Sequence, residues 1–508
     1  SMRKGLVLLL AVLLCAVLFV SCSQDKNRAV IYFNSNGGYG HMNPQPVTKG
    51  EETTLNANEF ARTGWHLDHW STTVTDMEGH RYPDGGQITV QQDTTLYAQW
   101  TANKYTVKYE PGEGTGTMPD QEFTYHEAQP LSENKFAKPA DKEFISWKVK
   151  DSDRYYMEKE EVYDLTPVDH GEVILEAQWG KGLEYRKKIV DWRTSIYDYK
   201  YLKCRIAESR VTWLDADTTE LETGWYAVKE NLDFEDRIEI KGDVHLILCD
   251  NTTLTAPKGI DVSNGDKLTI YDQGITNDPI GKIVVSGTSA AGIAGIGGGT
   301  KEKPSGEIII HGGNLDINVG EDGGAGIGGN SNASNGPIKI LGGIINVVGE
   351  GGSAGIGSGF AATPGLIEIF GGKVTVTGTS AAGIGAGLTR PGGTIIIGGD
   401  AEIDAEVGGN EASAGIGGSN ENYGGTIIIY GCTKITAKGG LRPEFDYGPE
   451  IRGSGIGGGN IKNEKLYGKL EYSSDKVKIE VSSDGKKWEA YDGKKQKQYM
   501  RVLPVTVE

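Results

Sequence analysis

Three carboxylates that alternate along one segment, Glu402, Asp404 and Glu406, are the residues best placed to do chemistry together. If this segment is a strand, alternate side chains point to one face, so the three would share an outward face. Clustered carboxylates can hold Ca²⁺, and with an Arg or Lys as the base they could act on an acidic sugar chain. Lysines occupy the matching positions of the neighbouring segments, at Lys373, Lys434 and Lys438.

The same charges also have a purely structural explanation. Opposite charges on adjacent strands stabilise one another by about 0.2–1 kcal/mol per pair. No arginine projects from these segments, because Arg390 and Arg442 fall in loops. We therefore expect no catalytic residues. An enzyme that resembles polysaccharide lyases and acts on acidic glycans stays as an alternative.

A second polar cluster contains residue types that bind metal ions, namely His66, Asp68 and His69 with His80 nearby. A second copy of this region, farther along the chain, has no counterpart to the cluster. The surrounding turns also impose no fixed spacing on these residues. We expect exposed polar side chains here, with no bound metal and no other cofactor.

Length and composition limit the possible classes of protein. A chain of 508 residues exceeds what one hydrophobic core usually supports, so two or more domains are expected. Its 75 glycines follow no collagen-like period, and apolar runs recur between them, which indicates an ordered glycine-rich repeat. The formal net charge of −18 repels nucleic acid, which we exclude as a partner. Cys204, Cys249 and Cys432 form no disulfide framework.

Residues 1–22 are expected to be a lipoprotein signal peptide with its lipidation site. Arg3 and Lys4 form a basic start, and the apolar run from Leu6 to Val20 is too short to span a bilayer comfortably. The run ends in Phe19-Val20-Ser21-Cys22, which resembles a bacterial lipoprotein cleavage box but has Phe where Leu is usual. The resemblance implies that Cys22 carries the lipid. It also implies a lipid-anchored protein of the cell envelope, at the outer membrane or cell surface.

Residues 29–100 and 104–179 repeat each other. Phe33 matches Tyr109, Trp70 matches Trp147, and Trp100 matches Trp179. Each copy begins and ends with alternating apolar residues typical of strands. Together with Asn36-Gly37-Gly38 and Arg62-Thr63-Gly64, the first copy resembles the internalin-type B repeat, or Listeria–Bacteroides repeat. The second copy is more divergent. The resemblance implies two small β-grasp-like modules, used on surface proteins as spacers or contact modules, with the tryptophans in their cores.

After a connector at 180–205, residues 206–464 predict a solenoid. An Ala/Ser-Gly-Ile-Gly marker recurs about every 30 residues, with two further strand-like segments between markers. Three short strands per repeat fit one coil of a parallel β-helix, and so many glycine and β-branched residues disfavour helices. Residues 465–508 lose the repeat and are expected to form a C-terminal β cap. The marker isoleucines are Ile296, Ile327, Ile356, Ile384, Ile416 and Ile456.

The predicted fold class is therefore all-β, with two β-grasp-like repeats followed by a parallel β-helix and its cap. Pairs such as Ile308 with Ile310, and Leu315 with Ile317, should point inward and stack from coil to coil. The region resembles the glycine-rich right-handed β-helix domains of secreted bacterial proteins, some of which are described as carbohydrate-binding. That resemblance is specific for architecture and says little about the ligand.

A row of apolar residues is predicted on the outward side of the second strand of each coil. If the row faces water, its regular spacing suits contact with a ligand, and a sugar polymer could stack along it. If it is covered, the cap, the connector or a B repeat of the same chain would lie on it. The row comprises Tyr271, His311, Leu341, Phe370 and Tyr430, with Ile309, Ile396 and Ile428 one step along.

These features together predict a non-catalytic lipoprotein of the cell surface, anchored in the membrane by its N-terminal lipid. Its β-helix would present a face for adhesion to a polysaccharide or to a surface protein. Two alternatives stay open at this point: the lyase-like enzyme described above, and a purely structural surface spacer.

Overall fold

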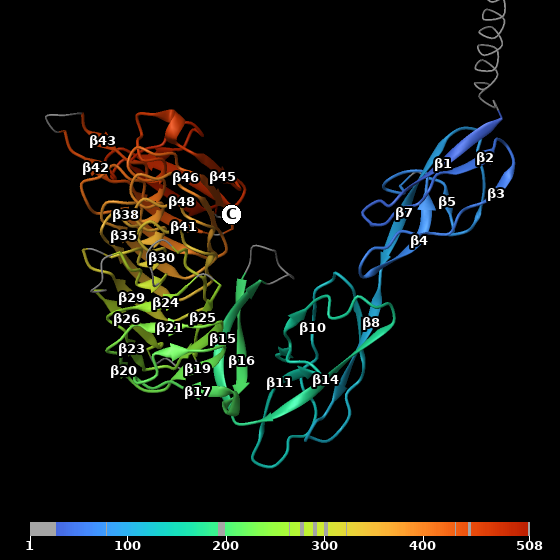
Figure 1. Ribbon diagram of the computed structural model, residues 1–508, viewed down its shortest axis with the longest axis horizontal. Helices are drawn as coiled ribbons and strands as arrows, with labels where there is room; N and C mark the ends of the chain where they lie inside the picture. Colours follow the sequence, from blue (N-terminus) through green and yellow to red (C-terminus); the bar gives the residue numbers. More distant parts are fainter. Residues whose placement is uncertain are drawn as a thin grey trace, which may run out of the picture. The chain divides into compact units, whose positions relative to one another are not determined.

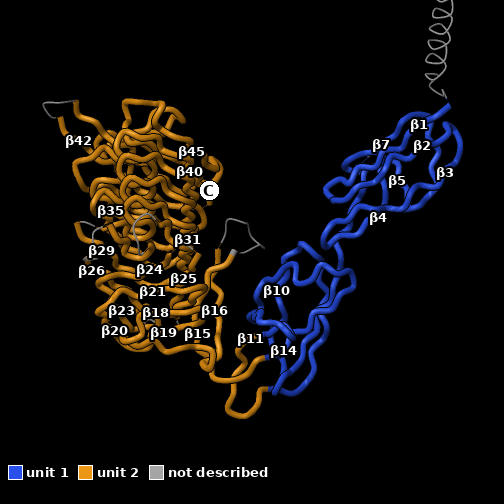
Figure 2. The backbone as a smooth tube through the Cα atoms, viewed as in Figure 1, with its two compact units in different colours: residues 1–137, 147–177 blue, residues 138–146, 178–508 orange. Residues whose placement is uncertain are grey.

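The computed structural model describes residues 27–77, 79–190, 199–263, 265–274, 279–287, 292–298, 303–321, 323–431, 433–444 and 449–505. The predicted leader, including Cys22, lies outside the described residues. The chain divides into two compact units (Figure 2), which comprise residues 1–137 with 147–177, and residues 138–146 with 178–508. The regular secondary structure of the described part is β-strand, as the sequence predicts, apart from the short 3₁₀ helices η1 (Glu208–Arg210) and η2 (Glu464–Leu466).

The first repeat is a five-stranded sheet in the order β2-β1-β7-β4-β5, accompanied by the two-stranded antiparallel sheet β3–β6. Only the central pair, β1 and β7, is parallel. Trp70 is fully buried and meets the ring of Phe33 edge-on at 5.1 Å. The strands are β1 (Arg28–Asn34), β2 (Gln45–Thr48), β3 (Glu52–Thr54), β4 (Trp65–Ser71), β5 (Arg81–Tyr82), β6 (Gln87–Thr89) and β7 (Thr94–Ala102).

The second repeat has the same strand order, β12-β11-β14-β8-β9, with β10–β13 as its small two-stranded antiparallel sheet. Its central pair, β8 and β14, is again parallel, and Trp147 takes the buried place of Trp70. The two repeats are thus copies of one topology. The strands are β8 (Lys104–Glu110), β9 (Gln121–Thr124), β10 (Gln129–Pro130), β11 (Glu143–Val149), β12 (Tyr155–Tyr156), β13 (Glu161–Val162) and β14 (Gly171–Gly180).

The rest of the chain winds into a three-sided parallel β-helix (Figure 1). The marker segments form one side, called here the marker sheet, in which each strand pairs in parallel with the same strand of the next coil. Its strands are β18 (Glu220–Leu221), β21 (Ile238–Ile240), β24 (Ile260–Val262), β27 (Ile296–Gly297), β30 (Ile327–Gly328), β33 (Ile356–Gly357), β36 (Ile384–Gly385), β39 (Ile416–Gly417) and β44 (Ile456–Gly457).

The second sheet follows the marker in each coil, and it also contains the hairpin β15–β16 as an addition at its flank. Its strands are β15 (Gly182–Val190), β16 (Tyr199–Ala207), β17 (Val211–Trp213), β19 (Gly224–Val228), β22 (Asp243–Leu248), β25 (Lys267–Asp272), β28 (Glu307–Ile310), β31 (Ile338–Ile340), β34 (Ile367–Ile369), β37 (Thr394–Ile397), β40 (Thr426–Ile429) and β45 (Lys469–Tyr472).

The third sheet completes each coil and ends in three antiparallel strands from the C-terminal segment. Its strands are β20 (Leu232–Asp233), β23 (Thr253–Thr255), β26 (Lys282–Ser286), β29 (Asn314–Asn318), β32 (Ile344–Gly349), β35 (Lys373–Gly378), β38 (Glu402–Val407), β41 (Lys434–Lys438), β46 (Val477–Ser482), β47 (Glu489–Ala490) and β48 (Tyr499–Pro504). A side hairpin, β42 (Leu441–Arg442) with β43 (Ile451–Arg452), projects from the last coils.

Aliphatic side chains stack in register inside the coils, as the alternation predicts. Ile308 pairs with Ile338, which pairs with Ile367, and all three are buried. Leu315 and Ile317 continue in the same way through the third sheet. At the end of the stack, β48 pairs with β41, so the last coil does not leave an open strand edge there.

The second glycine of each marker is required by the backbone. Gly357 has φ of +139°, and a Cβ added there would overlap the carbonyl oxygen of Gly385 in the next coil. Gly328 and Gly417 show the same conformation and the same close approach. Only glycine tolerates both conditions, which explains why the marker repeats so faithfully.

The side chain of Arg237 lies at the marker sheet, against the coils of β24 and β27. Its guanidinium donates hydrogen bonds to the carbonyl oxygens of Lys258, Ile260, Ala294, Gly297 and Gly298. Burial lowers the pKa of Arg237 to about 10. One side chain thus ties three successive coils together, an arrangement that no repeat in the sequence signals.

We predict that Gly357→Ala destabilises the β-helix more than Gly287→Ala does. Gly287 also has a positive φ, of +79°, but nothing lies within 4 Å of a Cβ added there. The control therefore loses only the backbone term, about 1–2 kcal/mol, while Gly357→Ala adds a steric clash. Urea unfolding followed by circular dichroism measures both, and equal losses would contradict the prediction.

Candidate binding faces of the β-helix

The predicted apolar row runs along the C-terminal ends of successive strands of the second sheet. Tyr271 and His311 stack with ring centroids 4.9 Å apart, and Phe370 lies 6.0 Å from Tyr430. Gly398 occupies the register position between Phe370 and Tyr430, and a Cβ there would overlap the Tyr430 ring. Because Gly398 has no side chain, the ring of Tyr430 can occupy that space beside Phe370. We call Tyr271, His311, Leu341, Phe370 and Tyr430 the aromatic row.

The aromatic row is covered by the β15–β16 hairpin, which belongs to the connector. Tyr185 packs edge-on against Tyr271 at 5.0 Å, and Tyr199 stacks on Phe370 at 5.2 Å. As a result Tyr271, Leu341 and Phe370 are only 6%, 6% and 4% exposed. Of the two possibilities that the sequence left open, the structure shows the covered one, because the connector carries aromatic residues that pack on the row. A role of the row in ligand binding stays a prediction, without an open surface to support it.

Polar contacts fix the hairpin in place. Arg186 donates two hydrogen bonds, of 2.7 and 2.9 Å, to the fully buried carboxylate of Asp272. The backbone N–H of Gly313 donates to the same carboxylate at 2.9 Å. The hydrogen bonds to Asp272 raise the pKa of Arg186. Lys188 pairs with Asp400 farther along the hairpin.

His311 accepts a hydrogen bond at Nδ1 from the backbone N–H of Lys188, at 3.0 Å. This geometry requires an unprotonated Nδ1. Burial under the hairpin, together with the charge of Lys187, lowers the pKa of His311 to about 3. The neutral ring therefore helps to hold the hairpin against the second sheet.

The third sheet, by contrast, is exposed on its outward side. The first two outward side chains of β35, β38 and β41 are exposed in every case. The register places Glu402 directly between Lys373 and Lys434, and Asp404 between Thr375 and Thr436. In Figure 1 the strands β20, β23, β26, β29, β35 and β38 of this sheet are labelled on the side of the β-helix away from β15 and β16.

A hollow of about 220 Å³ lies in this face. Of the charge pairs predicted on these strands, one is within ion-pair distance among the residues that the structure describes. Glu406 lies 3.6 Å from Lys438, beside the hollow. In the described part of the chain, the six polar side chains of the hollow form no ion pair and no hydrogen bond with one another. The polar residues that line the hollow are Lys373, Thr375, Glu402, Asp404, Lys434 and Thr436.

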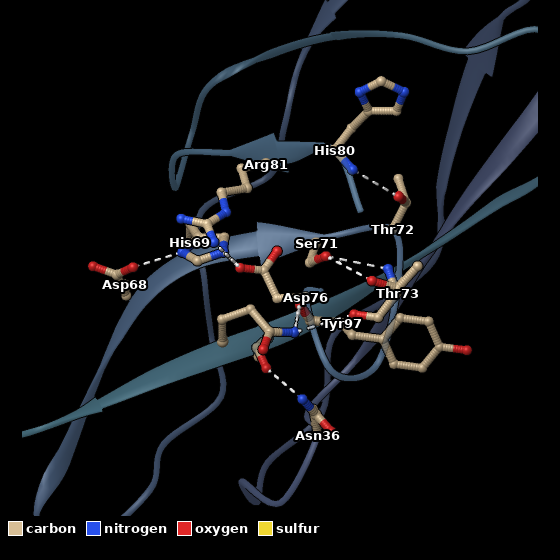
Figure 3. Close-up of polar contacts among 12 residues, drawn as sticks. Asn36, Asp68, His69, Ser71, Thr72, Thr73, Asp76, His80, Arg81 and Tyr97 are labelled. Atoms are coloured by element: carbon tan, nitrogen blue, oxygen red, sulfur yellow. Dashed lines mark hydrogen bonds and ion pairs between the residues drawn. The ribbon is translucent and has the colours of Figure 1, made fainter. Parts of the chain in front are cut away.

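The histidine cluster of the first repeat is a network of ion pairs (Figure 3). His69 contacts Asp68 at 2.6 Å through Nδ1 and Asp76 at 3.0 Å through Nε2, and Arg81 contacts Asp76 at 2.7 Å. Desolvation is the largest influence on Asp76 and raises its pKa. Hydrogen bonds from Ser71 and His69 and the nearby positive charges outweigh it, so the pKa is lowered overall.

The other two predicted members of that cluster lie apart from the network. His66 contacts Asn103 at 2.8 Å, and the ring of His80 points away from His69. Among the residues that the structure describes, no group of three or more His, Cys, Asp or Glu side chains is arranged to hold a metal ion. The network joins the loop at Asp76 to strands β4 and β5.

Comparison with known proteins finds a family model that matches the first repeat. Residues 30–99 match the family model of the Listeria–Bacteroides repeat domain. The resemblance drawn from Asn36-Gly37-Gly38 and the closing tryptophan is thereby confirmed for this segment. No curated protein and no solved structure matches the chain. For the β-helix, the function has to be argued from its own faces.

We predict that Asp272→Asn loosens the hairpin, because it leaves the Arg186 charge unpaired. Breaking a buried pair in this way costs about 3–5 kcal/mol. Glu184→Gln is the matched control on the same hairpin, since its pair with Arg205 is exposed and is worth about 0–1 kcal/mol. Hydrogen exchange of the β15 and β16 amides should accelerate only in Asp272→Asn.

We further predict that acid releases the hairpin through His311. Because its folded pKa lies near 3, below its ordinary 6.5, the neutral ring stabilises the folded state fully above pH 6.5. That contribution is lost as the pH falls from about 6.5 toward 3. Amide exchange in β15, divided by the intrinsic exchange rate at each pH, should therefore rise between pH 6.5 and 4 in the wild type. His311→Asn, which cannot titrate, should show a flatter profile, and an identical rise would refute this role.

Proposed function

We propose that this chain is a non-catalytic, lipid-anchored binding protein of the bacterial cell surface, and that the third sheet of its β-helix contacts the ligand. The observation that carries the proposal is the open polar face of that sheet. It presents exposed side chains on successive coils from β29 to β41, over a fully packed aliphatic core. A rigid array of this kind needs no rearrangement before it binds, which lowers the cost of association.

The second sheet and the marker sheet have less surface available for a ligand. The hairpin covers the aromatic row of the second sheet. Beside the marker strands, Asn330, Ser358 and Ser419 are fully buried. Ser358 donates to the carbonyl of Ala362, and Ser419 donates to that of Gly387. These polar groups are used within the chain, so the third sheet is the face that is left for a partner.

The anchor and the repeats fit the same proposal. The segment that ends in Cys22 resembles a lipoprotein leader, which supports attachment to the cell envelope by an N-terminal lipid, at the outer membrane or cell surface. Among the described residues, no helix is both long and apolar enough to cross a membrane. The two repeats, one of them a Listeria–Bacteroides repeat, would act as spacers between the lipid and the β-helix.

Binding is favoured over catalysis by the neighbours of the carboxylates. Asp404 has a threonine on each side in the register, and Glu402 has a lysine on each side. No arginine, one of the two bases that a lyase-like site could use, lines the hollow. A lyase-like enzyme acting on acidic glycans and a structural spacer without a ligand are the two alternatives that an experiment has to separate.

The test is a glycan and surface-protein array probed with the purified full-length protein in detergent. We expect Thr375→Arg, which places a bulky charge in the third-sheet face, to weaken binding at least tenfold. Thr363→Arg, an equal change in an exposed loop outside the third sheet, should leave it unchanged. Release of unsaturated sugars would favour the enzyme. Absence of any bound ligand would favour the spacer, and either result would overturn the proposal.

A further inference from the structure

The hollow in the third sheet has the chemistry of a sugar site. Resting on the function proposed above, we propose that it binds one ring of a neutral, hydroxyl-rich glycan that runs along the β-helix axis. The argument starts from shape. At about 220 Å³ the hollow is smaller than the roughly 300–1,000 Å³ of pockets for drug-sized ligands, so it suits a single ring of a longer chain.

The side chains of the hollow have unused hydrogen-bonding capacity. In the described part of the chain, Lys373, Glu402 and Lys434 take part in no ion pair, although the register places them side by side. Asp404 has no cationic partner either. Partial burial, and then the charge of Glu406, raise the pKa of Asp404. A sugar hydroxyl could donate a hydrogen bond to this exposed carboxylate in place of solvent.

The charge of the hollow favours a neutral partner. Its two lysines balance its two carboxylates, while the whole chain carries a formal charge of −18. A polyanion would meet Glu402 and Asp404, and a polycation would meet Lys373 and Lys434. Sugar hydroxyls both donate and accept hydrogen bonds, so adjacent hydroxyls of one ring could use the ammonium and carboxylate groups together.

A protein partner fits this surface less well. Stable protein contacts depend on a few buried aromatic or arginine anchors surrounded by a polar rim. No aromatic side chain lines the hollow, and the nearest exposed aliphatic residue on this face, Ile344, precedes Lys373 in the same row. Recognition here would rest on hydrogen bonds, which suits a polyhydroxyl chain.

The repeat of the β-helix extends the site along the axis. The row that contains Asp404 continues in register through Asp316, Asn346, Thr375 and Thr436. Neighbouring strands lie about 4.8 Å apart, so a polymer along the axis would meet one hydrogen-bonding side chain at each step of that length. Arg501 of the cap, in register with Thr436, is next in the row, and Glu480 follows it.

Titration calorimetry with matched oligosaccharides, one series neutral and one of uronic acids, tests this proposal. We expect the wild type to bind the neutral series at least tenfold more tightly than the uronic series of the same length. Asp404→Ala should weaken neutral binding about tenfold. Glu235→Ala, which removes an exposed carboxylate in the loop between β20 and β21, is the control and should leave binding unchanged.

A charge change makes the test sharper. Glu402→Lys leaves the hollow with a net positive charge, so it should increase binding of the uronic series while weakening the neutral one. Tighter binding of uronic chains by the wild type, or a ligand that is a protein only, would overturn the assignment of a neutral glycan and leave the proposed function standing. If Thr375→Arg has no effect on any ligand, the proposed function itself fails.

Discussion

At the marker glycines, the coils of this β-helix stack so closely that the backbone of one coil leaves no space for a side chain on its neighbour. At the marker, a Cβ on Gly328, Gly357 or Gly385 would overlap a carbonyl oxygen of the following coil. This steric constraint fixes the register of the coils that carry the marker, from β27 onward. With the register fixed, inward isoleucines stack on isoleucines, and each outward side chain is carried to a defined row. Both the core and the candidate site depend on it.

The same constraint explains how much of the fold could be predicted. Periodic glycine and isoleucine reveal the coil length, the three strands and the inward face, because stacking demands the same residue type at the same step. Arg237 and the β15–β16 hairpin could not be predicted in this way. Each occurs once, and its partners, such as the carbonyl of Gly297 or the carboxylate of Asp272, lie many residues away in the sequence. Contacts that occur only once produce no periodic pattern in the sequence, so periodicity cannot predict them.

For the aromatic row, the sequence was informative about position and left open whether the row is exposed or covered. Alternation placed Phe370 and Tyr271 on an outward face, which is correct, but outward from a coil does not mean exposed to water. Tyr185 and Tyr199 in the connector were the available signal, since a hairpin that carries aromatic residues can cover an apolar row. For Glu402 and Asp404 the register was predictable. That their charges stay unpaired was not, because pairing depends on side-chain conformation.

The two outward faces therefore differ in how freely they can change. A substitution in the aromatic row disturbs the hairpin as well as the second sheet, since Tyr271 and Phe370 each contact it directly. An outward residue of the third sheet, such as Thr375 or Asp404, contacts solvent and its two neighbours in the row, so its replacement costs little folding energy. Exposed substitutions of this kind usually change stability by about 0.5 kcal/mol or less. Ligand preference can thus vary on the third sheet while the glycine and isoleucine stack stays unchanged, and a repetitive chain can carry a specific site.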